Sequence, residues 1–161
     1  MTPAEYNKVV DLYSDNVYRF ILKNLRDKEK SQDVVQDSFE KLWINVEKVN
    51  FDKARSYLFT TAYRTMIDAI RKEKYKSSWD ATETLLHAHS EQYSDVGEIL
   101  EKAIMQLPDD QRSAIMLRDY EGYSYKEIEE ITGLNEAQVK VYIYRARLFL
   151  KNFIGQPEVL I

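Results

Sequence analysis

Residues 124–151 of this 161-residue chain run SYKEIEEITGLNEAQVKVYIYRARLFLK, and this stretch carries the clearest structural signal in the sequence. Ser124 and Glu127 have the spacing of a capping box, in which each side chain accepts a hydrogen bond from a backbone N–H group at the start of a helix. Gly133 suits a tight turn because glycine tolerates left-handed backbone conformations. A second capping pattern begins at Asn135. The stretch therefore predicts a short helix, a turn and a second helix.

The predicted second helix has one buried face and one exposed face. Apolar side chains at helical spacing form the buried stripe: Val139, Ile143, Ala146 and Leu150. Residues 138–152 contain no acid, and basic side chains lie outside this stripe. A helix-turn-helix places such a helix in the major groove of DNA, where its amino-terminal residues contact base edges. We predict DNA contacts for Glu136, Ala137, Gln138, Lys140, Val141, Tyr144, Arg145 and Arg147.

The alternative is a basic amphipathic helix within an ordinary helical bundle. Two capped helices, a glycine turn and an acid-free face together favour the helix-turn-helix.

The composition favours an all-α protein. Hydrophobic residues make up 44% and charged residues 31% of the chain, and only four Gly and three Pro are present. The absence of cysteine excludes disulfides, thiolate metal ligands and cysteine nucleophiles. A net charge of −4 means that DNA binding depends on local basic patches or on a partner, because phosphate contacts dominate non-specific affinity.

The first half of the chain predicts three more helices. The first begins at Thr2 and Pro3, and the second, from about Ser31, has an apolar face of Val35, Phe39, Leu42 and Val46. The third spans about residues 54–74 and has a basic far end. On this third helix we expect an unusual set of outward-facing residues: Tyr57, Phe59, Tyr63 and Arg64.

Residues 77–97 separate the two halves, because they contain acidic residues but no Lys or Arg and their periodicity is weak. We therefore predict two small helical domains, at residues 1–76 and 98–154, joined by an acidic flexible linker and followed by a tail at 155–161. No apolar segment is long enough for a membrane span and no signal sequence is recognised, so we expect a cytoplasmic protein without membrane contact of its own.

Several motifs resemble the extracytoplasmic-function (ECF) family of RNA polymerase sigma factors. In the second half these are Leu107-Pro108 with Arg112, residues 123–128, Gly133-Leu134, Val139-Lys140 and residues 145–147. In the first half, residues 33–43 resemble the polymerase-binding helix of the family. Residues 56–59 and 67–71 resemble the segment of the family that melts promoter DNA and recognises its minus-ten element. The resemblance extends from Tyr6 to Phe153.

The resemblance implies a factor that binds core RNA polymerase and promoter DNA and performs no catalysis itself. The expected polymerase contacts are Asp33, Gln36, Asp37, Phe39, Glu40 and Trp43. An acidic rim with aromatic anchors suits an interface, although Phe39 and Trp43 equally suit a core. The expected minus-ten contacts are Asn50, Phe51, Lys53, Ser56, Tyr57, Phe59, Tyr63, Arg64, Arg71 and Lys72. The recognition helix would bind the minus-thirty-five element, and an anti-sigma factor is an implied partner.

Two other classes of protein remain open. A conventional helix-turn-helix regulator would need a dimer interface to bind two half-sites, and no heptad seam is visible. An enzyme or metalloprotein would need a site, but His87 and His89 lack a third ligand at metal-binding spacing. No phosphate loop or nucleophile motif is present either. We therefore predict no enzyme activity, cofactor or metal.

Overall fold

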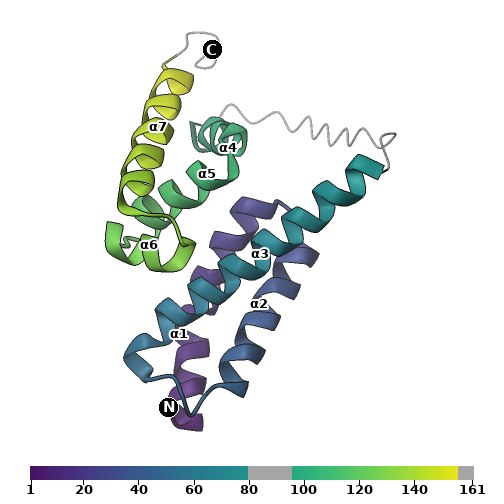
Figure 1. Cartoon of the computed structure of the whole chain (residues 1–161), viewed down its shortest axis with the longest axis vertical. Helices are drawn as coiled ribbons and strands as arrows, with labels where there is room; N and C mark the ends of the chain where they lie inside the picture. Colours follow the sequence, from purple (N-terminus) through teal and green to yellow (C-terminus); the bar gives the residue numbers. More distant parts are fainter. Residues whose placement is uncertain (80–95, 156–161) are drawn as a thin grey trace.

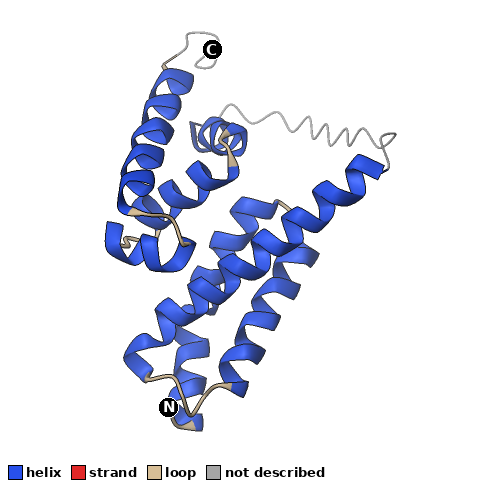
Figure 2. Ribbon diagram, viewed as in Figure 1, coloured by secondary structure: helices blue, strands red, loops and turns tan. Residues whose placement is uncertain are grey.

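The computed structural model describes residues 1–79 and 96–155, and these are helical without any strand (Figures 1 and 2). The predicted all-α fold with two helical units is confirmed. The first unit contains α1 (Pro3–Leu25), α2 (Lys28–Ile44), the 3-10 helix η1 (Phe51–Lys53) and α3 (Ala54–Trp79). The second contains α4 (Val96–Gln106), α5 (Asp109–Ile115), the π-helix η2 (Met116–Tyr120), α6 (Tyr125–Thr132) and α7 (Glu136–Ile154). The linker histidines lie outside the described residues, as does the tail from residue 156.

The first unit is a bundle in which α3 packs across α1 and α2 (Figure 1). Thr2 caps α1 in a capping box with Glu5, and the side chain of Asp27 accepts a hydrogen bond from the N–H of Lys30 to cap α2. Its core is formed by side chains with no exposed surface: Val9, Val17, Phe20, Ile21, Leu42, Ala54, Leu58, Phe59, Ala62 and Met66.

The prediction of the buried face of α2 is wrong: the observed buried face is rotated about the helix axis by part of a turn. The buried positions are Ser31, Val34, Ser38 and Leu42, whereas Val35 and Phe39 are only partly buried. Both serine hydroxyls donate to a carbonyl one turn earlier, at 2.6 Å from Asp27 O and 2.7 Å from Val34 O. These bonds satisfy the hydroxyls inside the bundle, so polar residues occupy a face that an apolar pattern cannot identify.

The second unit contains the predicted helix-turn-helix in α6 and α7. In both predicted capping boxes the side chains bond as expected, with the N–H of Glu127 3.1 Å from Ser124 Oγ and the N–H of Gln138 2.8 Å from Asn135 Oδ1. Gly133 ends α6 in the left-handed region at φ 78°. Ile128 and Ile131 of α6 are buried, as are three members of the predicted stripe of α7: Val139, Ile143 and Ala146.

Replacing Gly133 by alanine is expected to lower the free energy of unfolding by about 1–2 kcal/mol, because a Cβ disfavours the left-handed conformation. An added Cβ would meet no atom within 4 Å, so the cost is one of backbone conformation alone. Gly133→Asn is the matched control and should lose less, since asparagine tolerates this region. Urea unfolding measures both, and an equal loss in the two variants would contradict the explanation.

The two units also pack against each other through one continuous core. Helix α3 contacts α6, and α1 contacts α5. The ring of Phe59 on α3 meets the ring of Tyr123, which precedes α6, edge-on with centroids 5.2 Å apart.

Candidate nucleic-acid interface

Helix α7 presents the predicted DNA-binding residues to solvent. All of them are exposed: Glu136, Ala137, Gln138, Lys140, Val141, Tyr144, Arg145 and Arg147. Tyr144 is 67% exposed and Val141 41% exposed, so apolar as well as basic contacts are available on this face. Leu148, which the sequence analysis did not single out, extends the exposed apolar surface. The capped turn and the buried stripe fix this face outward.

An ion pair at the start of α7 limits how two of these residues can bind. Lys140 Nζ lies 2.7 Å from Glu136 Oε1, one helical turn earlier. The hydrogen bond and charge of Lys140 lower the pKa of Glu136, and the same contact raises the pKa of Lys140. Both side chains therefore stay charged at neutral pH. The Glu136 carboxylate can accept a hydrogen bond from a cytosine amino group, and Lys140 can reach a phosphate.

Arg147 has a partner that its sequence neighbourhood does not reveal. Its Nη2 lies 2.7 Å from Asp119 Oδ1 and its Nε 3.3 Å from Asp119 Oδ2, so the π-helix η2 holds the guanidinium. The hydrogen bond from Arg147 to Asp119 raises the pKa of Arg147. Among the predicted arginines of α7, Arg147 is thus oriented by the body of its domain.

The predicted minus-ten segment divides into accessible and covered residues. Asn50, Lys53, Arg64, Arg71 and Lys72 are exposed, and Phe51, Ser56 and Tyr57 are partly buried. The Tyr57 hydroxyl accepts a hydrogen bond from Asn45 Nδ2 at 3.1 Å and donates to Lys41 O at 3.4 Å. These bonds hold the Tyr57 ring against the end of α2.

The expectation that Phe59 and Tyr63 face outward is wrong in this structure. Phe59 is fully buried between Phe20 and Tyr123, and Tyr63 is 6% exposed. Burial raises the pKa of Tyr63 to about 12, and the charge of Asp110 on α5 contributes to the shift. The second helical unit therefore covers part of the face that the sequence analysis assigned to DNA.

The predicted polymerase-binding residues of α2 form a largely exposed surface. Asp33, Gln36, Asp37 and Glu40 are exposed, and Phe39 is partly buried against the core. Trp43 is 48% exposed and packs edge-on against Tyr6 with ring centroids 4.9 Å apart, so it serves both the bundle and the surface.

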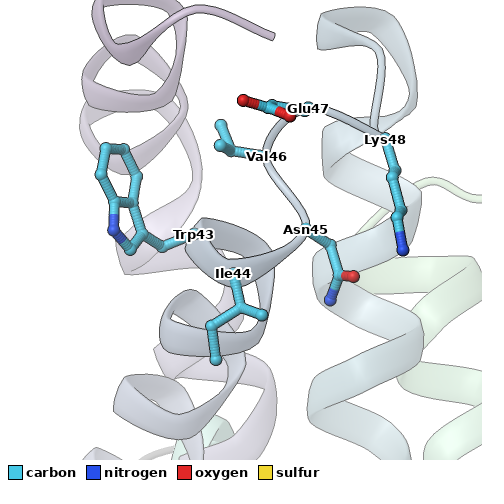
Figure 3. A pocket seen from close by; sticks show the side chains of 6 residues that line it. All are labelled: Trp43, Ile44, Asn45, Val46, Glu47 and Lys48. Atoms are coloured by element: carbon cyan, nitrogen blue, oxygen red, sulfur yellow. The ribbon is translucent and has the colours of Figure 1, made fainter.

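A shallow pocket continues this surface at the end of α2 (Figure 3). It is lined by Trp43, Ile44, Asn45, Val46, Glu47 and Lys48. Ile44 is 78% exposed and adds apolar surface that was not predicted from the sequence. An indole and an isoleucine beside charged residues have the composition of a protein-binding surface.

Within residues 1–79 and 96–155, no group of three His, Cys, Asp or Glu side chains could hold a metal ion. In the same residues no helix is long and apolar enough to cross a membrane.

Comparison with known proteins matches both halves of the chain to one family. The model for Sigma-70 region 2 matches residues 9–75, and the model for Sigma-70, region 4 matches residues 97–150. The ECF RNA polymerase sigma factor SigM of Bacillus subtilis is 30% identical over 153 residues, covering 90% of this chain and 92% of the relative. The RNA polymerase sigma factor SigV of the same organism is 32% identical over 137 residues, covering 83% and 81%.

A solved structure shares the fold. The sigma factor RpoE of Bartonella quintana, crystallised with the anti-sigma factor NepR, superimposes with a TM-score of 0.79 at 22% identity, covering 94% of this chain and 98% of that one. The predicted family is confirmed by the region 2 and region 4 matches in chain order and by relatives that share nearly the full length. This chain belongs to the ECF family of RNA polymerase sigma factors, which direct promoter recognition and transcription initiation.

Proposed function

We propose that α7 binds the minus-thirty-five element, that η1 and α3 bind and melt the minus-ten element, and that α2 docks on core polymerase. The observation that carries this proposal is the exposed face of α7, which has no acid from residue 138 to the end of the helix and has Arg145 and Tyr144 on its surface. In this assignment residues 1–76 form sigma domain two and residues 98–154 form sigma domain four.

The acidic balance of the chain fits a factor that depends on polymerase. A net charge of −4 gives little non-specific attraction for DNA, and the basic side chains proposed to contact the minus-thirty-five element are confined to one helix, α7. Polymerase would supply most of the electrostatic attraction, and α7 and α3 would supply the choice of sequence. The chain would therefore act in the cytoplasm, together with core polymerase.

An anti-sigma factor is the second protein partner that we propose. The support is family membership and the fold shared with RpoE of Bartonella quintana, which was crystallised with NepR. Its identity would have to be established by purifying the chain from its native cell with whatever binds it.

The minus-ten assignment predicts that Tyr57→Ala loses promoter melting while promoter binding is retained. Stacking of an unpaired base on an aromatic ring contributes about 1–3 kcal/mol, so open complex should fall by about 10-fold or more. Permanganate footprinting of holoenzyme on promoter DNA measures the melted thymines.

Tyr57→Phe is the matched control, because it keeps the ring and removes the hydroxyl that bonds Asn45 and Lys41. If the ring stacks on a base, the phenylalanine variant melts promoters nearly as well as the parent. Equal losses in both variants would show that Tyr57 only anchors α3 to α2, and the stacking role would be rejected.

A further inference from the structure

The side chain of Arg147 on α7 is held by an acid from another part of its domain. Its Nε lies 3.3 Å and its Nη2 2.7 Å from the two carboxylate oxygens of Asp119, which belongs to the π-helix η2. The π turn closes with a bond between residues five apart, here from the N–H of Glu121 to Met116 O at 3.1 Å. An uncommon turn, of a kind often found at functional sites, thus carries the acid that meets the proposed DNA-binding helix.

Stability gives little reason for this ion pair. The side chains of Arg147 and Asp119 are 49% and 42% exposed. Solvent screens such pairs, and most of them contribute little to the free energy of unfolding. An acid beside a DNA-binding surface also repels phosphates, and residues 138–154 of α7 contain none. Asp119 therefore adds an acid from η2 to a stretch of surface from which the sequence of α7 excludes acids.

The geometry of the pair leaves one edge of the guanidinium for another acceptor. A guanidinium has five N–H groups in a fixed plane. Asp119 accepts hydrogen bonds from Nε and from one N–H of Nη2, so Nη1 and the second N–H of Nη2 point away from the carboxylate. Two N–H groups on one edge match two oxygens of a phosphate. The acid thus fixes the direction of an edge that suits a phosphate.

Arg147 shares a flank of α7 with Lys140 and points away from Arg145. Lys140 precedes Arg147 by seven residues, which is nearly two helical turns and about 10 Å along the axis. Each residue turns by about 100°, so Arg145 points about 160° away from Arg147. Both cations of the flank have an acidic partner, Glu136 for Lys140 and Asp119 for Arg147, whereas Arg145 makes no ion pair within the part of the chain that the structure describes.

We propose that Asp119 is a positioning residue for promoter binding, which holds Arg147 so that its outer edge donates to one backbone phosphate of the minus-thirty-five element. The proposal rests on the assigned contact of α7 with DNA. Fixing a freely rotating arginine during binding costs about two- to tenfold in affinity, and orientation in advance avoids this loss. Removing the acid should therefore weaken DNA binding, although it also removes a negative charge that repels phosphates.

The sign of this effect is measured with the full chain bound to core polymerase, by competition for a promoter duplex. Asp119→Ala should weaken binding by about three- to tenfold, and Asp119→Asn should lose less, because its amide oxygen can still accept a bond from Arg147. Glu130→Ala removes an exposed acid from α6 and is the matched control, with a change of less than about twofold. Tighter or unchanged binding in Asp119→Ala would overturn the proposal.

A scan of the DNA backbone separates positioning from a general loss of structure. Duplexes with an uncharged methylphosphonate at successive positions of the minus-thirty-five element are bound by the parent, Arg147→Ala and Asp119→Ala. At the contacted phosphate the replacement should cost the parent about tenfold or more, because a charged hydrogen bond is lost. The cost should fall below about twofold in Arg147→Ala and below about fivefold in Asp119→Ala, at this position alone. Parent-like sensitivity there in Asp119→Ala, or a change at every position, would overturn the positioning role.

Base preference distinguishes failure of this inference from failure of the proposed function. A phosphate contact carries no sequence information, so Asp119→Ala should keep the parent's ratio of binding to preferred and altered minus-thirty-five elements, whereas Arg145→Ala should lower it. A lowered ratio in Asp119→Ala would overturn the phosphate contact. If Asp119→Ala changes nothing and Arg145→Ala still relaxes the preference, only the positioning role is rejected. If the parent does not distinguish the two elements, the proposed role of α7 fails.

Discussion

Arg145→Ala is expected to reduce transcription from promoters with the preferred minus-thirty-five element by about 10- to 100-fold. A bidentate contact between an arginine and guanine contributes about 1–3 kcal/mol of discrimination, and the Arg145 side chain is exposed on α7, in a stretch of the helix without acid. Run-off transcription over a promoter library measures both the yield and the preference for the upstream element.

The matched control for this variant is Lys102→Ala, which removes one exposed positive charge from α4 in the same domain. If loss of charge alone mattered, the transcription yield would fall equally in both variants and the preference for the upstream element would remain. If Arg145 contacts a base, only Arg145→Ala relaxes the preference at that position. Wild-type preference in Arg145→Ala would remove Arg145 from the interface.

Phe20→Ala is expected to lower the free energy of unfolding by about 3–5 kcal/mol, the usual cost of deleting a buried aromatic ring. Phe20 is fully buried and lies 5.7 Å from the ring of Phe59, centroid to centroid, so its loss opens a cavity beneath α3. Leu12→Ala on the same helix removes a side chain that is 48% exposed and should cost far less. Urea unfolding compares them, and similar costs would contradict the described core.

Local signals made the helix-turn-helix predictable. The capping boxes at Thr2, Ser124 and Asn135 and the turn at Gly133 depend on residues within one helical turn of each other, so sequence spacing specifies them. The recognition face follows from the same spacing, because its buried stripe fixes which side chains remain outside.

Interactions between distant segments were not predictable in this way. Arg19 and Glu121 are 102 residues apart, and Asp119 reaches Arg147 across 28 residues. The prediction that Phe59 and Tyr63 face outward failed because it also depends on contacts between distant segments. A helical pattern shows which residues share a face, but it does not show that a second domain covers that face. The prediction of the buried face of α2 failed because Ser31 and Ser38 occupy that face, where their hydroxyls donate hydrogen bonds to backbone carbonyls four residues earlier.

We propose that this chain selects promoters as a subunit of RNA polymerase through two separate contacts. The most direct measurement is run-off transcription and gel-shift binding on one promoter library, with the chain alone, core polymerase alone and both together. We expect promoter-specific transcripts and stable complexes only when both proteins are present, with preferences at the minus-ten and minus-thirty-five elements. Tight binding of the chain alone to a palindromic site as a dimer, without association with polymerase, would contradict it.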